Sequence, residues 1–340
     1  MDFKQLRALV TVAQTGNVTR ASALLNLVQP AVSRQLRLLE EDVGATLFER
    51  GRHGMVLTEA GKTLVEYARR VLHELDRARA EIRPSQGSIG GIVTVGLLPS
   101  TCDLLSSALV TSVAMRYPGI RVRISMGYAG HLQRWLEDGE IDVALLYDPK
   151  QTPTIQVRPL LEEGLWVVGL PQAGLRPEHP MRLAELARHA LVLPSAPHGL
   201  RSLVENAATL MGLQLSVVAE TNAMSVQKSL VLGGHGLTIL PSIAVTEDIA
   251  RGILTAAPLI EPSLARKIVL ALPTNRHTTP SVHYVLTALV DCMKDAVRRG
   301  DWLAARWLAA SRAPLRVDFL IWSRTHYDHL TKKFNKEHPS

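Results

Sequence analysis

The stretch that decides the fold is QPAVSRQLRLLEE, residues 29–41. Three of its apolar side chains follow the spacing of a helix and would form one buried stripe: Val32, Leu36 and Leu39. The opposite side of this helix could enter a major groove, and it carries Gln29, Pro30, Ser33, Arg34 and Arg37, with the small Ala31 allowing close approach. The stretch therefore predicts a helix with one face for a protein core and the other for nucleic acid.

The neighbouring segments supply the rest of a DNA-binding unit. A short amphipathic helix is expected over residues 18–25, with Asn17 as its N-cap, and a further helix over residues 3–13. Two helices joined by a tight turn at residues 26–28 predict a helix-turn-helix. Residues 47–58 predict a β-hairpin wing, and its basic tip contributes Arg50, Arg52 and His53. A polar helix face alone is more often solvated surface, but the combination favours DNA binding.

The order and spacing of three short motifs resemble a known family. QPAVSRQ at 29–35, LFER at 47–50 and LTEAG at 57–61 look like the winged helix-turn-helix of LysR-type transcriptional regulators, and the resemblance covers residues 1 to about 86. We expect a DNA-binding domain over residues 1–58. The family usually places Ser or Thr before the Gln-Pro pair, whereas this chain has Val28. If Val28 is the N-cap, the missing hydroxyl costs about 1 kcal/mol.

The following segment, residues 59–86, predicts a linker helix that dimerises. Apolar and small residues alternate steps of four and three along it, as in a heptad seam: Leu57, Gly61, Leu64, Ala68, Val71, Leu75, Ala78 and Ile82. One helix cannot bury this seam alone. The alternative is that the helix packs on its own domain, and the family resemblance favours dimerisation through the seam from Leu64 onward. The helix should end near Pro84.

Composition is consistent with a cytoplasmic DNA-binding protein of more than one domain. The chain has 340 residues, 46% hydrophobic content and a formal net charge of +7, with the positive excess at its two ends. The N-terminus runs directly into a charged amphipathic helix, and no apolar run is long enough to span a bilayer. Cys102 and Cys292 lack a paired spacing and fit ordinary thiols better than a redox pair or metal site.

Residues 91–297 predict an α/β effector-binding domain with a largely parallel sheet. Short strands and helices alternate in a first set over residues 91–162 and in a second over 163–266, where a strand starts at Leu165. Residues 267–297 should return to the first set, giving two halves that enclose a cleft. The layout resembles the periplasmic-binding-protein-like domain of LysR-type regulators, and VLGGHGLTILP at 231–241 is close to that family's sequence. The loop at 193–201 is similar to nitrogen-assimilation members.

Ligands bind such sheets at the carboxyl ends of strands, beside helix N-termini. The polar residues at these positions are the candidate effector-binding set: Ser100, Thr101, Tyr147, Ser195, His198, Arg201 and Asn222. Each residue alone could be only a helix cap, a turn residue or a surface salt bridge. If they converge on one cleft, Arg201 and His198 suit an anionic or polar effector.

Enzyme motifs are absent from the sequence: there is no nucleophile elbow, phosphate loop, zinc-protease helix or dinucleotide fingerprint. We expect no cofactor and no metal, although an α/β enzyme or ligand-binding module with an accessory DNA-binding domain stays open. The family resemblance implies a dimer of dimers on a promoter dyad, with RNA polymerase as a further candidate partner. Residues 298–340 extend beyond the resemblance and have no assigned role; residues 301–311 could continue a helix.

Overall fold

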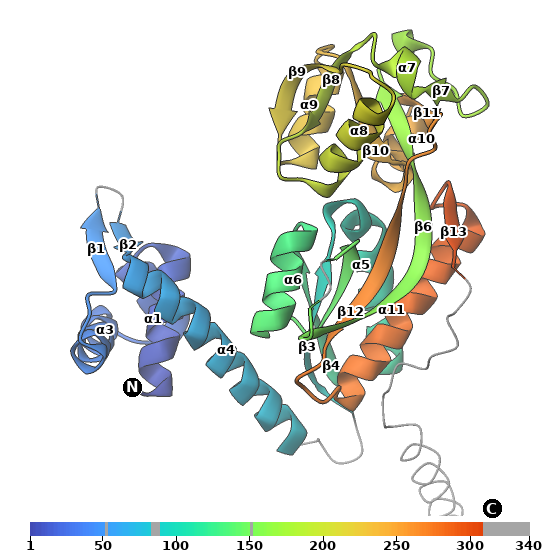
Figure 1. The fold of residues 1–340 in the computed structure, drawn as a ribbon. Helices are drawn as coiled ribbons and strands as arrows, with labels where there is room; N and C mark the ends of the chain where they lie inside the picture. The colour runs from blue at the N-terminus through green and yellow to red at the C-terminus, as the bar shows by residue number, and fades with distance from the viewer. Residues whose placement is uncertain (52–53, 83–88, 150–151, 309–340) are drawn as a thin grey trace, which may run out of the picture.

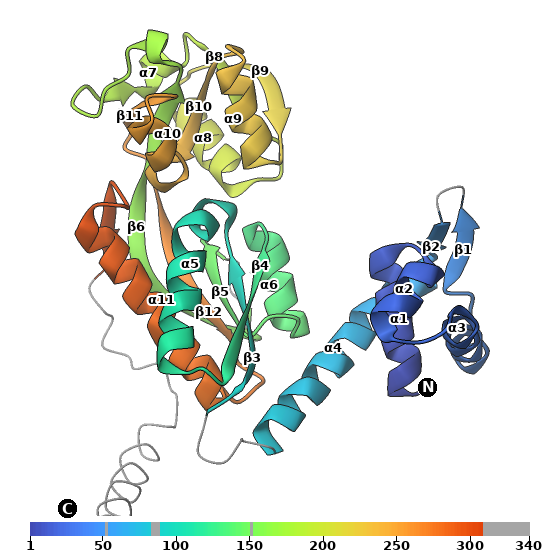
Figure 2. The ribbon, with the colours of Figure 1, turned by 180° about the vertical axis from the view of Figure 1, so that it is seen from behind.

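The computed structural model describes residues 1–51, 54–82, 89–149 and 152–308. A small helical domain at the N-terminus leads into one long helix, and this helix runs towards a larger two-lobed α/β part (Figures 1 and 2). The predicted fold class is confirmed: a winged helix-turn-helix precedes an α/β domain.

The N-terminal domain contains the expected helices and hairpin: α1 (Phe3–Thr15), α2 (Val18–Leu25), α3 (Gln29–Val43), β1 (Phe48–Gly51) and β2 (Gly54–Leu57). Asp2 forms a capping box with Gln5 at the start of α1, and Asn17 caps α2. The stripe of Val32, Leu36 and Leu39 is buried in the domain core, as the spacing predicted. The two halves of the sequence pattern on α3 therefore separate into a core face and an exposed face.

Val28 is the N-cap of α3, and its side chain makes no capping hydrogen bond. It is also 70% exposed. Pro30 lies in the first turn of α3, where its missing N–H would have had no helical partner. The helix thus begins without the side-chain cap that a Ser or Thr would provide.

The long helix α4 (Glu59–Ile82) is fixed to the N-terminal domain at its first turn. The Thr58 hydroxyl accepts the Gly61 N–H at 3.0 Å. Gly61 itself lies so close to the loop before β1 that an added Cβ would be 2.1 Å from the Leu47 carbonyl oxygen. Any larger residue at Gly61 would push α4 away from the domain.

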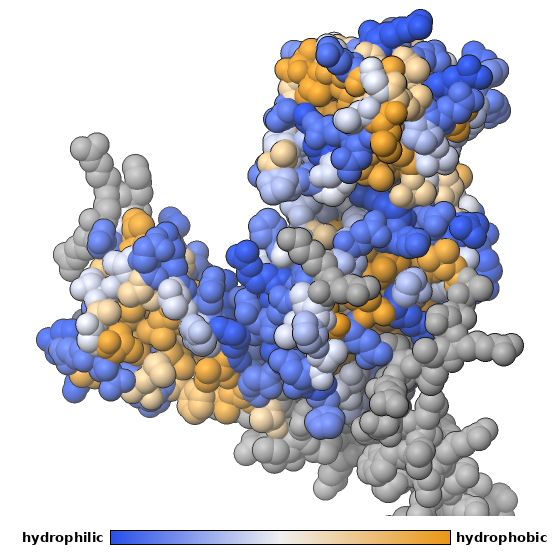
Figure 3. Space-filling model, viewed as in Figure 1, coloured by the Kyte–Doolittle hydropathy of each residue, from blue (hydrophilic) through white to orange (hydrophobic). Residues whose placement is uncertain are grey.

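The predicted seam on α4 divides into two parts. Ala68 is buried in the N-terminal core and Leu64 packs against it, so the alternative of packing within the domain is correct for this part. Further along, Leu75 is half-buried, whereas Val71 (43%) and Ala78 are exposed. The Ile82 side chain lies outside the described residues. Hydrophobic surface is visible over α1 and the adjoining part of α4 in Figure 3.

The α/β part has two lobes joined by two long strands (Figure 1). Lobe I contains β3 (Gly91–Leu97), α5 (Pro99–Arg116), β4 (Ile120–Met126), α6 (Ala129–Asp138), β5 (Val143–Tyr147) and α11 (Pro280–Arg299). Lobe II contains β7 (Met181–Arg182), α7 (Leu183–Leu186), β8 (Ala190–Pro194), α8 (Gly199–Leu210), β9 (Ser216–Thr221), α9 (Met224–Leu232), β10 (Leu237–Pro241), α10 (Thr246–Ala250) and β11 (Thr255–Ile260), with short 3-10 turns at Pro171–Ala173 and Ser242–Ala244. Each lobe has its own hydrophobic core.

The joining strands are β6 (Ile155–Gly169) and β12 (Ala265–Pro273). β6 pairs with β12 in its first part and with β10 and β11 in its last. Placing the start of a strand at Leu165 was therefore wrong, because a single 15-residue strand passes from one lobe to the other. Neighbouring strands within each lobe are parallel, β4-β3-β5 and β10-β8-β9, whereas both joining strands pair antiparallel.

The chain after α11 does not continue as a helix, so that expectation was wrong. Gly300 ends α11 in the left-handed conformation, with φ at 77°. Trp302 then enters the core of lobe I and is only 2% exposed. β13 (Ala305–Trp307) pairs antiparallel with β6. Residues 301–308 are thus a packing extension of lobe I, while Trp322 lies outside the described residues.

Candidate effector pocket and DNA-binding face

The predicted DNA-reading residues lie together on α3. Gln29, Pro30, Ser33, Arg34 and Arg37 are exposed, and Ala31 is partly exposed. Arg37 makes a surface ion pair with Glu41 at 3.5 Å. In the wing, Arg50 belongs to β1, and Arg52 and His53 lie outside the described residues. A continuous polar face on α3 is therefore available for a ligand, next to a hairpin.

A cavity of about 400 Å³ lies between the lobes. It is formed where β3, β5, β8, β9 and β10 end, as expected for ligand sites in parallel sheets. Its apolar lining comes from both lobes and includes Leu98, Leu200, Leu203, Met224 and Leu240. Its polar lining includes Ser100, Tyr147, Asp148, His198, Asn222 and Arg266.

Four of the seven predicted effector residues line this cavity: Ser100, Tyr147, His198 and Asn222. The other three do not. The Thr101 hydroxyl is fully buried and donates to the Leu98 carbonyl in the first turn of α5. The Ser195 backbone N–H donates to the Thr221 carbonyl, which links two neighbouring loops of lobe II.

Arg201 is the main correction to the predicted site. Its guanidinium pairs with Glu205 at 2.6 Å and with Glu220 at 2.9 Å, and it is absent from the cavity lining. The salt-bridge reading, raised as the plainer alternative, therefore describes Arg201. Its carboxylate partners sit on α8 and β9, and they hold the side chain within lobe II.

Arg266 on β12 is the arginine that does reach the cavity, and the sequence analysis missed it. Its Nε donates to Glu163 Oε1 and its Nη2 donates to the Tyr147 hydroxyl, both at 2.7 Å. The guanidinium carbon also lies 3.5 Å from the Tyr147 ring centre. The rule that ligands bind at the carboxyl ends of strands does not identify Arg266, because it is the second residue of β12 and lies at the amino end of that strand.

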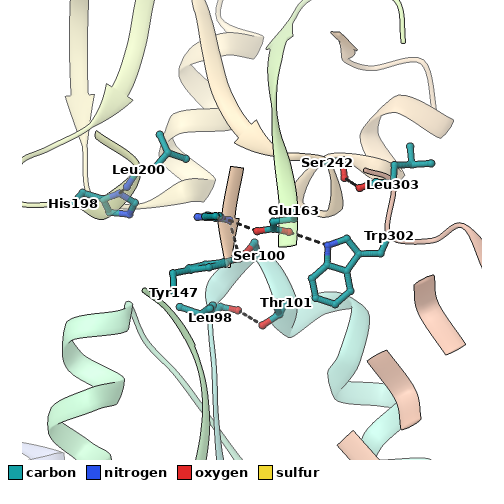
Figure 4. Close-up of polar contacts among 11 residues, drawn as sticks. Leu98, Ser100, Thr101, Tyr147, Glu163, His198, Leu200, Ser242, Trp302 and Leu303 are labelled. Carbon is teal, nitrogen blue, oxygen red and sulfur yellow. Dashed lines mark hydrogen bonds and ion pairs between the residues drawn. The ribbon is translucent and has the colours of Figure 1, made fainter. Parts of the chain in front are cut away.

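A buried polar chain continues from Arg266 in both directions. Its members Ser100, Tyr147, Glu163 and Trp302 are labelled in Figure 4. Glu163, fully buried on β6, accepts the Trp302 indole N–H at 2.9 Å through its second oxygen. On the other side, the Tyr147 hydroxyl lies 2.8 Å from the Ser100 hydroxyl. Burial raises the pKa of Tyr147 despite the opposing Arg266 charge, so the phenol stays protonated. Since Tyr147 accepts from Arg266, it can donate its own proton to Ser100.

His198 contributes to the cavity as a neutral ring. Burial, followed by the Arg266 charge, lowers the pKa of His198, so the ring is neutral near pH 7. Its Nδ1 accepts the Leu200 N–H at 3.2 Å and caps α8. The ring also meets Tyr128 of lobe I edge-on, with centres 5.5 Å apart. His198 and Tyr128 thus face each other across the two lobes.

Two helices of lobe I begin at the cavity without side-chain caps. The N-caps of α5 and α6 are Leu98 and Tyr128, and neither makes a capping hydrogen bond. The residues that follow, Ser100 on α5 and Ala129 and Gly130 on α6, line the cavity. The positive ends of two helix dipoles therefore point to the same space.

The far end of α6 meets the linker helix. Asp138, the last residue of α6, pairs with Arg70 of α4 at 3.3 Å. Four residues later, Asp142 accepts the Thr94 N–H and lies 3.2 Å from His73 Nε2 of α4. Asp142 is buried, and the His73 side chain is only 10% exposed. We call these contacts the linker joint.

Within the described residues, no cluster of side chains could hold a metal ion and no helix is long and apolar enough to cross a membrane. The arrangement provides two separable parts: an exposed helix face beside a wing, and a pocket between two lobes. Together they define a DNA-binding protein that responds to a small ligand.

Comparisons with known proteins agree with this class. The sequence profile described as "Bacterial regulatory helix-turn-helix protein, lysR family" matches residues 3–62, and that described as "LysR substrate binding domain" matches residues 86–298. The chain belongs to the LysR family of DNA-binding transcriptional regulators, with an effector-binding domain at its C-terminal side.

Several relatives cover nearly the whole chain. The HTH-type transcriptional regulator BbuR of Bordetella bronchiseptica is 32% identical over 304 residues, which are 89% of this chain and 93% of that protein. The nitrogen assimilation regulatory protein nac of Escherichia coli is 25% identical over 87% of this chain and 97% of its own length.

Solved structures have the same fold. A Corynebacterium glutamicum OxyR C206 mutant has a TM-score of 0.57 and 25% identity over 88% of this chain and 93% of its own. Full-length CbnR complexed with its target DNA has a TM-score of 0.64 and 22% identity over 87% of this chain and all of its own, which bears on the fold alone.

Proposed function

We propose that this protein is a cytoplasmic, non-enzymatic regulator in which α3 reads DNA and the pocket between the lobes binds the controlling effector. The observation that carries this proposal is the cavity of about 400 Å³, lined by both lobes at the strand ends. A ligand there touches both lobes, so it can favour one arrangement of them over another. The uncapped starts of α5 and α6 favour a polar or anionic group on the ligand.

The proposed DNA-binding residues are those of the exposed α3 face together with the wing: Gln29, Pro30, Ala31, Ser33, Arg34, Arg37, Arg50, Arg52 and His53. Support comes from the exposure of the α3 members while the opposite stripe is buried. The N-terminal half of such a helix contacts base edges, and the wing contacts the backbone. A dyad of such sites is the proposed target, with RNA polymerase as a further partner at the promoter.

A homodimer through α4, and a dimer of dimers overall, is the proposed assembly. Its support is exposed apolar surface on α1 and the middle of α4, including Phe3 (49% exposed), Tyr67 (57%) and Val71 (43%). The hydrophobic area in Figure 3 lies in the same region. Since Leu64 and Ala68 are used within the domain, the proposed contact shifts towards Val71 and Leu75.

The effector site can be tested by filling it. Ser202 is exposed on α8 and lines the cavity, so Ser202→Trp puts a large ring into the pocket without disturbing the core. Thr209→Trp, on the same helix but outside the cavity lining, is the matched control. Both variants are compared with the parent in a reporter strain grown on different carbon and nitrogen sources.

We expect the parent and Thr209→Trp to change reporter expression between growth conditions, and Ser202→Trp to stay at one level. DNA binding of all three, measured by gel shift, should be equal. A Ser202→Trp variant that responds like the parent would show that the controlling ligand binds elsewhere.

A further inference from the structure

Residues 302–307 run along the junction between the lobes after the end of α11, and we call them the brace. They follow the part of the chain that matches the family profile. Trp302 anchors the brace in the core of lobe I, and its indole N–H donates to the buried Glu163 on β6. β13 then pairs antiparallel with β6. The brace is therefore fixed to a strand that joins the two lobes.

One side-chain hydrogen bond ties the brace to lobe II. The Ser242 hydroxyl donates to the Leu303 carbonyl, and Ser242 is fully buried. It begins the short 3-10 turn after β10, and the next residue, Ile243, is buried in the core of lobe I. Val245 then packs with Leu240 inside lobe II. The chain after β10 thus leaves lobe II, packs on lobe I and the brace, and returns.

The brace and the cavity lie on opposite sides of the joining strands. Pro241 lines the cavity, whereas its neighbour Ser242 contacts the brace. Neither Trp302 nor Leu303 lines the cavity. In Figure 4, His198 lies on one side of β6, and Trp302 and Leu303 lie on the other. A rotation of the lobes about β6 and β12 that narrows the cavity therefore moves Ser242 away from Leu303.

The backbone of the brace is held from both ends. Ala304 has φ at 53°, in the left-handed region that residues other than glycine rarely adopt. Its carbonyl accepts the Gly164 N–H of β6 at 3.1 Å. A strained residue persists only where its surroundings fix it, and here the buried Trp302 ring and the paired strand β13 fix the two sides. The brace is thus a defined structural element of the junction.

We propose that the brace is a hinge stop: it holds the two lobes in the open arrangement, and the Ser242–Leu303 contact must break before they close. This inference takes the pocket from the proposed function and adds the element that sets how readily the lobes close on it. A ligand shifts the lobes only by the difference between its affinities for the open and closed forms, so the brace raises the difference that is needed. Loss of one such hydrogen bond should raise the ratio of closed to open molecules by roughly two- to tenfold.

The test measures the distance between the lobes in the full-length protein by pulsed electron paramagnetic resonance. Spin labels are attached through His131→Cys on α6 of lobe I and Thr209→Cys on α8 of lobe II, both at exposed positions near the cavity lining. The native Cys102 and Cys292 are replaced by serine. Labelled protein is diluted with unlabelled protein so that only distances within one chain are measured. Thermal unfolding checks that every variant folds.

Ser242→Ala removes the tie to lobe II. Its matched control is Ser281→Ala, because the Ser281 hydroxyl donates to the Gly90 carbonyl at 2.7 Å within lobe I. Ser242→Ala should enlarge the short-distance population by roughly two- to tenfold. Ser281→Ala should keep the distance distribution of the parent.

A second pair of variants acts on the backbone of the brace. Arg306→Pro disrupts the pairing of β13 with β6, whereas Arg306→Ala keeps this pairing and loses only an exposed ion pair with Glu162. Arg306→Pro should shift the distances in the same direction as Ser242→Ala, and Arg306→Ala should not. If Arg306→Pro does not fold, Ser242→Ala and its control decide the question.

Unchanged distances in Ser242→Ala or in folded Arg306→Pro would overturn the hinge-stop proposal. A shift of either variant to longer distances, or an equal shift in Ser281→Ala, would overturn it as well. The measurement needs no effector. A failure of the proposed pocket is therefore separate, because it appears as a normal reporter response of Ser202→Trp.

Discussion

Arg34→Ala is expected to weaken operator binding without affecting folding. Arg34 is exposed on α3 and makes no ion pair among the described residues, so its loss should change the free energy of unfolding by less than about 0.5 kcal/mol. An arginine that contacts a base edge contributes about 1–3 kcal/mol to discrimination, which corresponds to roughly 5- to 150-fold in affinity. The loss should be largest for the preferred sequence and small for unrelated DNA.

The assay is fluorescence anisotropy with a duplex selected from a random pool, titrated at several salt concentrations. Arg7→Ala, an exposed arginine on α1 outside the α3 face, is the control and should bind as the parent does. Arg52→Ala in the wing should weaken binding to every sequence and lower the salt slope by about 0.9, as loss of one phosphate contact does. If Arg34→Ala binds the selected duplex as tightly as the parent, α3 does not read the bases.

Two further predictions concern assembly and pH. Leu75→Glu on α4 should weaken self-association by at least about a hundredfold, because it puts a charge into the proposed contact. Thr63→Glu, at an exposed position elsewhere on the helix, should leave self-association unchanged. Sedimentation of the full chain measures both variants, and an unchanged assembly of Leu75→Glu would exclude this face. The pKa of His198 is lowered in the folded protein, so its contribution to stability is present above its unfolded pKa of about 6.5 and is lost as pH falls through the folded pKa. His198→Asn, which keeps a capping acceptor, should therefore lose less thermal stability than the parent between about pH 7.5 and 5.5, and an equal loss in both proteins would assign acid sensitivity to other groups.

Local sequence patterns could predict the features that depend on residues close together in sequence, such as the buried face of a helix or a helix cap. The stripe of Val32, Leu36 and Leu39 determines one face of α3, and Asn17 caps α2 through its own side chain, so both were found correctly. The same reasoning placed Ser100, Tyr147, His198 and Asn222 at the pocket, because each lies at or just after the end of a strand or at the start of a helix there.

The errors arose where distant segments meet. Arg201 lies in the first turn of α8, in the segment after β8, but Glu205 and Glu220 bind it within lobe II. The Glu220 contact depends on the pairing of β9 with β8. Arg266 reaches the pocket because β12 lies beside β6 over most of its length, which no short spacing indicates. Trp302 lies 139 positions from its partner Glu163 in sequence. Long-range pairing determined these contacts, so local periodicity could not.

The two ends of α6 have a thermodynamic consequence. Its first residues line the pocket, and its last residue belongs to the linker joint with α4, which carries the DNA-binding domain. A displacement of α6 at the pocket therefore changes the position of α4 at the joint. Because free energy coupling is reciprocal, an effector that alters DNA affinity by a given factor must itself bind DNA-bound protein with an affinity altered by the same factor. The operator is then as much a regulator of effector binding as the effector is of the operator.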